Sequence, residues 1–464
     1  MNDSCPADRV IRLDYHPDSS YYHARLRDLP WPVWLDSGFP GSAAGRYDIM
    51  AADPYCTLHG QAGSLRLHAV DGGEDAIVPD AFDALRGLLG RPRPAPAGLP
   101  FGGGAIGFLG YDLLRADFGL AGRRGLADWP DIAVGLYDWA IVVDHLHRRS
   151  YLVQAGRDPR RPDLVESLVP RLHGVLPTAP EPARRDRVTV RGAIVDNGMS
   201  RADYAAAFER IQRYIHDGDC YQANFAQRFR ARVDDDAWSC YCAMRATNPA
   251  PYAALLEYPF GEVLSASPER FLSLTGRQVR TEPIKGTRPR GDDPVHDQAL
   301  RSELFNSDKD RAENLMIVDL LRNDLGRVCE PGSIAVPRLF AVESFATVHH
   351  LVSTVTGRLR PDQDALDLLR ACFPGGSITG APKRRAMQII DELEPHRREV
   401  YCGSVIRLGF DGNLDSSIAI RTALLRGDTA LYWAGGGIVA DSTCDAEYQE
   451  SLDKAAAFRR LFPR

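Results

Sequence analysis

A carboxylate and an amine that could together perform acid–base or nucleophilic chemistry occupy neighbouring strand-like runs. Glu269 lies in the first run, residues 262–274, and Lys285 directly follows the second, residues 278–284. Thr275-Gly276-Arg277 between the runs is typical of a three-residue hairpin loop. As long as these two residues stand alone, the alternative interpretation is an acid and a lysine exposed on the surface.

The register of this hairpin decides whether the two side chains meet. We expect Leu274 to face Gln278. In that register Glu269 faces Pro283, and Lys285 lies one diagonal step further on the same face of the sheet. Because diagonal neighbours in a sheet are about 7–8 Å apart, long side chains at such positions can reach one small ligand. We therefore predict a shared site for Glu269 and Lys285.

Three further acids could hold a metal ion. Glu447 and Glu450, with Lys454, fall at i, i+3 and i+7 on one face of a helix expected near the C-terminus, and Glu313 lies in a second helical stretch. Carboxylates from distant helices, completed by water and substrate oxygens, are usual ligands of Mg²⁺. No set of Cys and His residues competes for a softer metal. A solvated helix face is the alternative for the C-terminal stripe.

A candidate anion-binding set completes the chemistry. Arginine binds carboxylates through two parallel hydrogen bonds, and free glycine N–H groups can hold a further carboxylate oxygen. Arg421, Tyr401 and the glycine run that ends in Gly437 provide such groups. Together with Mg²⁺ they predict a site for an anionic metabolite, and these residues do not by themselves name the molecule.

Two glycine-rich runs resemble phosphate-binding loops but lack the necessary context. The spacing of Gly102, Gly104 and Gly107 fits a dinucleotide fingerprint, yet it follows a Pro-rich connector where a strand is required. In the second run Lys383 comes three residues after Gly380, whereas a Walker loop needs the lysine next to the glycine. We therefore expect neither run to bind a nucleotide.

The bulk composition limits the class of protein. A chain of 464 residues exceeds the roughly 250–300 at which one core stops growing, so two or three units are expected. The formal net charge of −6 without a basic stripe argues against nucleic acid as a partner. Nine scattered cysteines do not suggest a disulfide scaffold. Because the chain shows neither a signal-peptide pattern nor an apolar run of about 18 residues, we expect a soluble cytoplasmic protein without a membrane partner.

The elements that must position these residues indicate an α+β architecture. Residues 1–155 are expected to form a β-rich lobe, 156–195 a Pro- and Arg-rich connector with a short helix, and 196–464 the catalytic domain. We place the preferred lobe boundary at residues 176–187. An amphipathic helix is predicted over 201–217, with Tyr204, Phe208, Ile211 and Ile215 on one face. Strands in blocks followed by helices in blocks favour α+β over a parallel doubly wound fold.

The motifs of this chain resemble those of the chorismate-utilising enzymes, which include anthranilate, isochorismate and salicylate synthases. The resemblance is strong over about 200–460 and looser over 25–155, and the motifs occur in the order of that family. They are residues 267–271, 283–291, 311–315, 317–325, 350–353, 379–383 and 440–442, followed by Glu447 and Glu450. The resemblance implies the two-lobed fold of anthranilate synthase component I, with large antiparallel sheets flanked by helices and an active site in the cleft between the lobes.

The resemblance also implies roles for individual residues. Glu313 and Glu450 would bind Mg²⁺ with Glu447 beside them, Glu269 would be the acid or base near the 4-hydroxyl group of chorismate, and His350 would lie close to the ring. The residues implied to bind the substrate are Arg421, Tyr401, Gly437, Lys454, Ser377, Thr379, Gly380, Gly286 and Thr287.

Two positions indicate which reaction the resemblance implies. Members that add water carry a lysine base where this chain has Gln222, and a neutral amide cannot deprotonate water. Anthranilate synthases carry a small residue in place of Lys285. The implied activity is therefore the amination of chorismate at carbon 4 through a covalent Lys285 intermediate, giving 4-amino-4-deoxychorismate for 4-aminobenzoate and folate synthesis. Anthranilate synthase component I, a water-adding enzyme and a non-catalytic ligand-binding subunit are the alternatives.

The resemblance implies two further partners. The chain contains no recognisable glutaminase domain with a cysteine nucleophile and a His-x-Glu partner, so ammonia would come from a separate glutamine amidotransferase subunit. Relatives also hold tryptophan in the N-terminal lobe, and the matching positions here are Ser37, Arg46, Tyr47, Pro251 and Tyr252. Small residues at 43–45, where some relatives carry an aromatic side chain, leave open whether tryptophan is bound.

Overall fold

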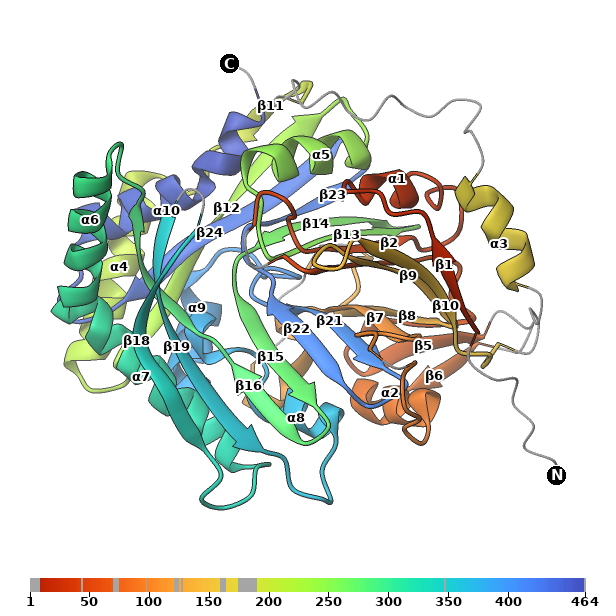
Figure 1. Cartoon of the computed structure of the whole chain (residues 1–464). Helices are drawn as coiled ribbons and strands as arrows, with labels where there is room; N and C mark the ends of the chain where they lie inside the picture. Colours follow the sequence, from red (N-terminus) through yellow and green to blue (C-terminus); the bar gives the residue numbers. More distant parts are fainter. Residues whose placement is uncertain are drawn as a thin grey trace.

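Two twelve-stranded sheets packed face to face form the frame of the protein in this computed structural model (Figure 1). The structure describes residues 9–42, 45–69, 75–96, 98–120, 125–126, 128–158, 164–173, 190–345 and 348–462. The preferred lobe boundary at 176–187, and Ala43 and Ala44 of the tryptophan argument, lie outside the described residues.

Sheet A runs from one edge to the other in a single path, with one short strand attached to its side. In spatial order it contains β1 (Arg9–Leu13), β10 (Arg149–Gln154), β9 (Trp139–Asp144), β3 (Tyr47–Ala51), β2 (Val33–Asp36), β13 (Tyr252–Tyr258), β14 (Gly261–Ser267), β23 (Thr422–Arg426), β24 (Thr429–Ile438), β12 (Gln222–Val233) and β11 (Gly192–Asp196), and β20 (Gly380–Ala381) pairs with β12.

Sheet B has the same kind of path. In spatial order it contains β17 (Ile284–Pro289), β19 (Val348–Arg358), β16 (Gln278–Thr281), β15 (Arg270–Thr275), β22 (Leu414–Ile418), β21 (Ser404–Gly409), β7 (Gly104–Leu109), β8 (Ile132–Tyr137), β4 (Cys56–Gln61), β5 (Ser64–Ala69) and β6 (Ala76–Val78), and β18 (Ala335–Ser344) pairs with β19.

Ten α-helices and three short 3₁₀ turns are found among the described residues. They are α1 (Ser20–His23), α2 (Ala81–Leu89), η1 (Tyr111–Leu114), η2 (Ala116–Phe118), α3 (Leu164–His173), α4 (Arg201–His216), α5 (Ala237–Thr247), α6 (Pro294–Asn306), α7 (Asp308–Gly326), α8 (Ala365–Cys372), η3 (Gly376–Ile378), α9 (Lys383–Leu393) and α10 (Cys444–Arg460). No described helix is both long and apolar enough to cross a membrane.

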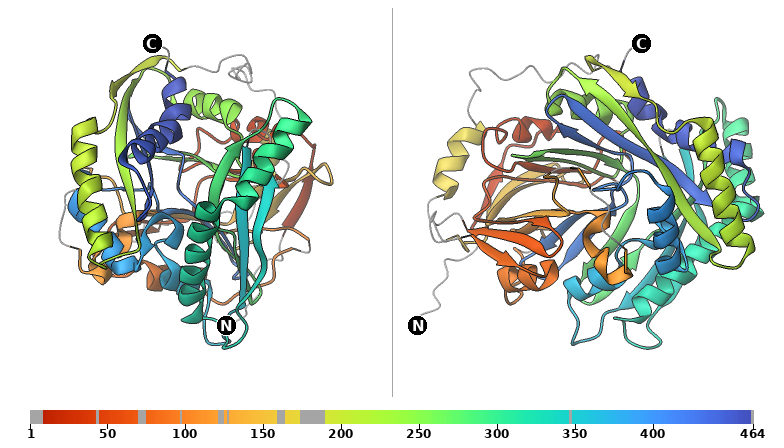
Figure 2. Two further views of the ribbon diagram at one scale, coloured as in Figure 1. Left: turned by 90° about the vertical axis from the view of Figure 1, so that its left-hand side faces the viewer. Right: turned by 180° about the vertical axis from the view of Figure 1, so that it is seen from behind.

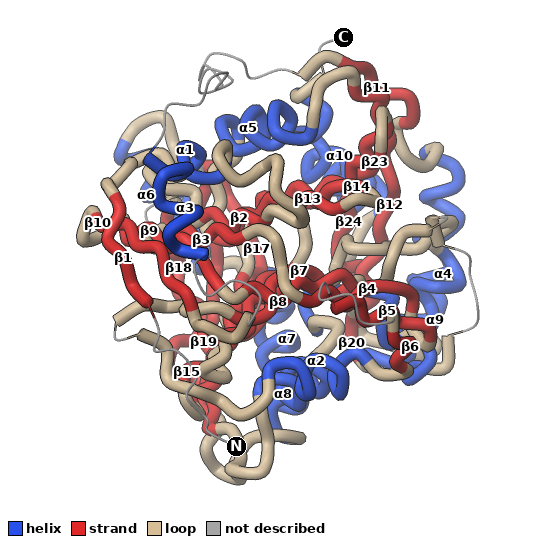
Figure 3. Tube along the Cα trace, turned by 90° about the vertical axis from the view of Figure 1, so that its right-hand side faces the viewer, coloured by secondary structure: helices blue, strands red, loops and turns tan. Residues whose placement is uncertain are grey.

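The largest hydrophobic core lies between the sheets. Val33 and Ile49 of sheet A and Ile106 and Val134 of sheet B are fully or almost fully buried in it. A second core forms where α1, α3, α5 and α10 cover the outer face of sheet A (Figure 1). Helices α2 and α8 contact each other below sheet B, as the side view shows (Figure 3). The result is a layered α+β architecture, as the sequence predicts.

Each sheet contains one block of strands from each half of the chain, and the two blocks meet at a single pair of strands. β7 of the N-terminal half pairs with β21, and β2 pairs with β13. In Figure 1 the orange β7 and β8 therefore lie beside the blue β21 and β22. The view from behind shows the early strands on one side of the molecule and the late strands on the other (Figure 2). Residues on the two sides of the predicted boundary thus share both sheets.

The amphipathic helix predicted over 201–217 is confirmed as α4. Ser200 caps its first turn by accepting a hydrogen bond from the backbone N–H of Asp203. Tyr204, Phe208 and Ile211 are buried against the outer face of β12. The apolar face thus places α4 behind the strand that carries Gln222.

Candidate active site

Lys285 and Glu269 meet at Ser377. The amine of Lys285, on β17, donates a hydrogen bond of 3.3 Å to the backbone carbonyl oxygen of Ser377 in η3. The hydroxyl group of Ser377 donates one of 2.7 Å to Oε1 of Glu269. Glu269 directly precedes β15 and is only 5% exposed. The structure therefore brings the predicted nucleophile, which is half-buried, and the predicted acid, which is buried, into one site.

The route by which they meet differs from the predicted hairpin register. Leu274 pairs with Val279 and not with Gln278, because Gly276 adopts a φ of +58° and allows a tight two-residue turn. β16 then ends at Thr281, and Ile284 of β17 pairs with Val352 of β19. Lys285 is thus not a diagonal neighbour of Glu269 in one hairpin, and the predicted register is wrong.

Burial controls the charge state of Glu269. Removal from water raises the pKa of its carboxyl group to about 7, while the hydrogen bond from Ser377 and the positive charges of Lys285 and Lys454 oppose that rise. Such a group exchanges its proton near neutral pH, which suits a general acid. A buried carboxyl group with this pKa is compatible with the acid–base chemistry predicted for Glu269.

His350 lies on β19, where it is paired with Thr287 of β17. Its Nδ1 is 2.9 Å from the hydroxyl group of Thr287, two residues beyond Lys285. Burial and the nearby positive charge of Arg421 lower its pKa to about 4, so the ring is neutral at pH 7. Gly286 between Lys285 and Thr287 has a φ of +79°, and a Cβ there would lie 2.8 Å from the carboxyl carbon of Asp310. The glycine lets β17 approach α7 closely.

The three predicted metal ligands converge from α7 and α10. Nζ of Lys309 lies 3.9 Å from Glu313 and 3.8 Å from Glu447, so this ammonium group links the two helices. A Cβ on Gly436 would lie 3.1 Å from oxygens of both Glu447 and Glu450. The Lys285 charge also acts on Glu313 and Glu450. The carboxylates thus face the same site as the amine.

The fit of these acids to a divalent cation rests on their electrostatics. Burial raises the pKa of Glu313 and of Glu447, so each carboxylate lacks the positive charge that would fully stabilise it. Oε2 of Glu447 is buried without a hydrogen-bond partner. Among the described residues no three His, Cys, Asp or Glu side chains are gathered closely enough to form a metal site alone. Mg²⁺ held by one or two carboxylates plus substrate and water fits this arrangement.

The predicted carboxylate-binding residues border the acids. Arg421 adopts an unusual φ of +51° and is largely buried, which lowers its pKa, and no acidic side chain of the described chain pairs with its guanidinium group. Lys454 instead pairs with Glu450 at 2.6 Å and donates to the carbonyl oxygen of Gly435 at 2.9 Å. Tyr401 is buried and stacks on Trp433 with their rings 6.3 Å apart. An anionic ligand would supply the counter-charge that Arg421 lacks.

Strands β12, β20 and β24 form one side of the site. Gln222 is fully buried, and neither its Oε1 nor its Nε2 has a partner. A Cβ on Gly437 would lie 2.7 Å from that Nε2. Gly380 has a φ of +147°, and a Cβ there would lie 2.1 Å from the carbonyl oxygen of Gln222. Thr379 is fully buried and donates a hydrogen bond of 2.9 Å to the carbonyl oxygen of Gly375.

Lys383, from the second glycine-rich run, has protein partners of its own. Its Nζ donates to Asp324 at 2.6 Å and to the carbonyl oxygen of Cys372 at 2.9 Å, so it ties α9 to α7 and α8.

Two residues that border the site were not predicted from the sequence. Arg398 is 1% exposed and holds the carbonyl oxygens of Asn224 and Ile378, and Asn224 lies two positions after Gln222. Strand alternation was the only signal for Asn224.

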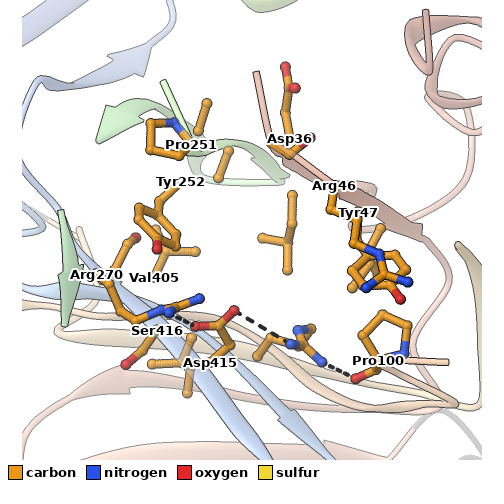
Figure 4. A pocket seen from close by; sticks show the side chains of 18 residues that line it. Asp36, Arg46, Tyr47, Pro100, Pro251, Tyr252, Arg270, Val405, Asp415 and Ser416 are labelled. Atoms are coloured by element: carbon orange, nitrogen blue, oxygen red, sulfur yellow. Dashed lines mark hydrogen bonds and ion pairs between the residues drawn. The ribbon is translucent and has the colours of Figure 1, made fainter. Parts of the chain in front are cut away.

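A separate pocket contains all five residues predicted for tryptophan. Ser37, Arg46, Tyr47, Pro251 and Tyr252 line it together with residues of β15, β21 and β22. Figure 4 shows Arg46 and Tyr47 on one side and Tyr252 and Arg270 on the other. Arg270 pairs with Asp415 at 3.2 Å in its wall. The pocket lies between the two sheets.

Comparison with known proteins names the family. A sequence model of the family "chorismate binding enzyme" matches residues 35–460. The chain is 48% identical to aminodeoxychorismate synthase component 1 of Klebsiella aerogenes over 96% of this chain and 97% of that protein. It is 42% identical to anthranilate synthase component 1 of Streptomyces coelicolor over 82% of this chain and 76% of that protein.

Solved structures agree on the fold. The crystal structure of anthranilate synthase component I from Streptococcus pneumoniae superimposes with a TM-score of 0.79 at 32% identity, covering 89% of this chain and 92% of that one. The predicted anthranilate synthase component I-like α+β fold is thereby confirmed. The two antiparallel sheets, the buried acid beside an amine and the family match over most of its length lead to one conclusion: the chain belongs to the chorismate binding enzymes.

Proposed function

We propose that this chain is component 1 of an aminodeoxychorismate synthase, which replaces the 4-hydroxyl group of chorismate with an amino group. The observation that carries the proposal is the placement of Lys285 beside Glu269 and within electrostatic reach of Glu313 and Glu450. An anthranilate synthase would have a small residue in place of this amine. The uncharged Gln222 in the wall supports ammonia over water as the second nucleophile.

In the first step the neutral amine of Lys285 attacks carbon 2 of chorismate. The ring double bonds shift, the bond between carbon 4 and its hydroxyl group breaks, and protonated Glu269 gives that hydroxyl group the proton with which it leaves as water. Lys285 becomes a secondary ammonium bound to the ring, and Glu269 becomes a carboxylate. The raised pKa of Glu269, about 7, supports its protonated form in this step.

In the second step ammonia attacks carbon 4. The double bonds shift back, the bond to carbon 2 breaks, and Lys285 leaves as a neutral amine. The new ammonium group at carbon 4 then returns a proton to Glu269. The enolpyruvyl group stays on the ring, and both protein residues regain their starting protonation states.

Glu313, Glu447 and Glu450 would hold a Mg²⁺ ion, on which enzymes of this family generally depend. When bound, this Lewis acid would fix the ring carboxylate and help the hydroxyl group to leave. Arg421 would bind a substrate carboxylate, with Tyr401, Gly437, Lys454, Gly286 and Thr287 around it. Ser377 would hold Glu269 and Lys285 in register, next to Thr379 and Gly380, while the neutral His350 would lie against the ring.

Ammonia would come from a separate glutamine amidotransferase subunit, since the relative from Klebsiella aerogenes is named as a first component. The isolated chain should therefore use ammonium but not glutamine. Addition of a glutaminase subunit should make glutamine a substrate. Glutamine-dependent turnover by the isolated chain would contradict this division of labour.

The pocket lined by Ser37, Arg46, Tyr47, Pro251 and Tyr252 is proposed to bind tryptophan. A fluorescence or calorimetric titration should show saturable binding of one tryptophan per chain. Replacing Ser37 by a bulkier leucine should abolish that binding without changing the KM for chorismate. Absence of binding up to millimolar tryptophan would contradict the proposal that tryptophan is a ligand.

The assignment is tested by product analysis. The purified chain is incubated with chorismate, Mg²⁺ and ammonium, and the products are identified by mass spectrometry with and without a lyase that aromatises the product. The expected product is 4-amino-4-deoxychorismate, and Lys285→Ala should form none while still binding chorismate with Mg²⁺. Anthranilate or isochorismate as the main product, or normal turnover by Lys285→Ala, would overturn the proposal.

A further inference from the structure

We propose that Asn224 is a further substrate-binding residue, whose side-chain N–H donates a hydrogen bond to an oxygen of the bound substrate. The inference rests on the proposed function only in naming chorismate as that substrate. Three independent features carry it: the unsatisfied amide of Asn224, the face of β12 on which it lies, and the contacts that fix its backbone.

The side-chain amide of Asn224 is buried and unsatisfied. The residue is 6% exposed, and its Nδ2 has no hydrogen-bond partner. Buried polar groups in folded proteins almost always have partners, because an unmade hydrogen bond costs free energy. An unsatisfied buried amide beside a ligand site therefore points to an acceptor that arrives with the ligand.

The face of β12 on which Asn224 lies is the face of the site. Successive side chains of a strand alternate, so Asn224 and Gln222 point to the same side, and Ala223 and Phe225 point to the other, where they pack against α4. Asn224 is paired directly with Gly437 of β24. The missing side chain of Gly437 leaves its space to the amide of Gln222, since a Cβ there would lie 2.7 Å from Nε2 of Gln222.

The backbone of Asn224 is fixed from one side of β12. Its N–H donates to the carbonyl oxygen of Thr379 at 2.8 Å, and its carbonyl oxygen accepts from Arg398 at 2.6 Å. Glu394, which pairs with Arg398 at 2.6 Å, accepts the next free N–H, that of Ala226, at 2.8 Å. The short strand β20 ends before these positions. The buried ion pair of Glu394 and Arg398 therefore makes the backbone hydrogen bonds to β12 that a longer neighbouring strand would make.

This support makes Asn224 rigid without using its side chain. Protein groups satisfy its backbone, while its amide stays free and faces the wall that contains Gln222 and Gly437. A residue kept for stability would show the opposite pattern. Asn314 does: it is fully buried, its Oδ1 accepts a hydrogen bond from Ser353, and its Nδ2 donates to the carbonyl oxygen of Leu351 at 3.5 Å.

Asn224→Leu tests the inference, because leucine has nearly the same size and no donor. Chorismate affinity is measured by calorimetry with Mg²⁺ in Lys285→Ala, which prevents turnover, with and without Asn224→Leu. Steady-state KM values for chorismate and ammonium are measured with Lys285 present, and Tm is measured throughout. We expect chorismate to bind about tenfold more weakly in Asn224→Leu. The Tm should not fall, because an unsatisfied buried amide is removed.

Asn314→Leu is the matched control for stability, and its Tm should fall by about 2 °C or more because it loses satisfied hydrogen bonds. Unchanged chorismate affinity in Asn224→Leu would overturn the inference, as would a fall in Tm like that of the control. Because affinity is measured without turnover, failure of the proposed amination would leave this result unaffected and would be seen separately in the product analysis.

Discussion

The hydroxyl group of Ser377 donates a hydrogen bond of 2.7 Å to the carboxyl group of Glu269, while the carbonyl oxygen of the same serine accepts one from Lys285. One residue of η3 thus touches both groups that the proposed chemistry uses. Its hydroxyl group stabilises the ionised form of Glu269, and its backbone fixes the amine. Substitutions at Ser377 and Glu269 should therefore change how activity and stability depend on pH.

Ser377→Ala should extend activity to higher pH. The hydrogen bond from Ser377 lowers the pKa of Glu269, so its loss raises that pKa above its value of about 7. If activity needs protonated Glu269, its decrease at alkaline pH should occur about one pH unit higher in Ser377→Ala than in the wild type. The pH profile of kcat measures this shift, and Ser333→Ala, on a distant turn, is the control. If kcat decreases at the same alkaline pH in Ser377→Ala and in the wild type, Glu269 is excluded as the acid.

Glu269→Gln should remove a pH dependence of stability as well as the activity. Because the folded-state pKa of about 7 lies above the ordinary value of 4.5, the protonated carboxyl group stabilises the fold below pH 4.5, and this contribution is lost as the pH rises through 7. Between pH 4.5 and pH 7 the free energy of unfolding of the wild type should fall by about 3 kcal/mol, whereas that of Glu269→Gln should not show this fall. Urea unfolding at pH 5 and pH 8 measures the difference.

The same comparison on an exposed acid provides the control. Glu209→Gln, on the solvent side of α4, should change stability equally at both pH values. The activity of Glu269→Gln should fall by about 10²–10⁴-fold, as expected for loss of a general acid. Equal stability differences at pH 5 and pH 8 for Glu269→Gln would mean that its carboxyl group is not titrated near neutral pH.

Glu447→Gln should raise the Mg²⁺ concentration needed for half-maximal activity. Oε2 of Glu447 is buried without a partner, and the amide keeps the shape of the side chain but removes its charge. Calorimetric titration with Mg²⁺ should show affinity reduced by about 10–100-fold, the range typical of altered metal sites. Glu262→Gln removes a half-buried carboxylate on β14 and should leave Mg²⁺ affinity unchanged. Equal metal affinity in both variants would place the cation elsewhere.

Gly380→Ala should destabilise the fold severely. A Cβ at this position would lie 2.1 Å from the carbonyl oxygen of Gln222, which is backbone and cannot move aside easily, and the φ is +147°. We expect a loss of about 3 kcal/mol or more in the free energy of unfolding. Gly427→Ala isolates the backbone term, because it has a φ of +58° and no atom within 4 Å, and should cost only about 1 kcal/mol. Similar losses for both would disprove the clash.

The parts of the fold that could be predicted are those set by local pattern. α4 and α10 were recognisable because apolar or acidic side chains recur with helical spacing. The helix that carries Glu447 and Glu450 was therefore placed correctly. The pairing of strands that are distant in the sequence could not be predicted. For example, β7 pairs with β21, but neither strand has a residue pattern that identifies its partner.

The candidate site was predicted in composition more than in geometry. Glu269 and Lys285 meet because η3 brings Ser377 between them, not because they share a hairpin. One glycine, Gly276, shortened the turn and changed the register by one residue. The partner of Lys383 could not be predicted, because Asp324 lies on a helix whose position no local pattern reveals.

The junction of early and late strands in each sheet has a consequence for how the chain is made. When β2 and β7 leave the ribosome, the strands on which they pair, β13 and β21, have not been synthesised. Contacts so distant in sequence form slowly, and unpaired strand edges of incomplete sheets invite aggregation. The nascent N-terminal half should thus depend on chaperones until the last third emerges, and two fragments cut between residues 174 and 189 should regain activity only when they fold together.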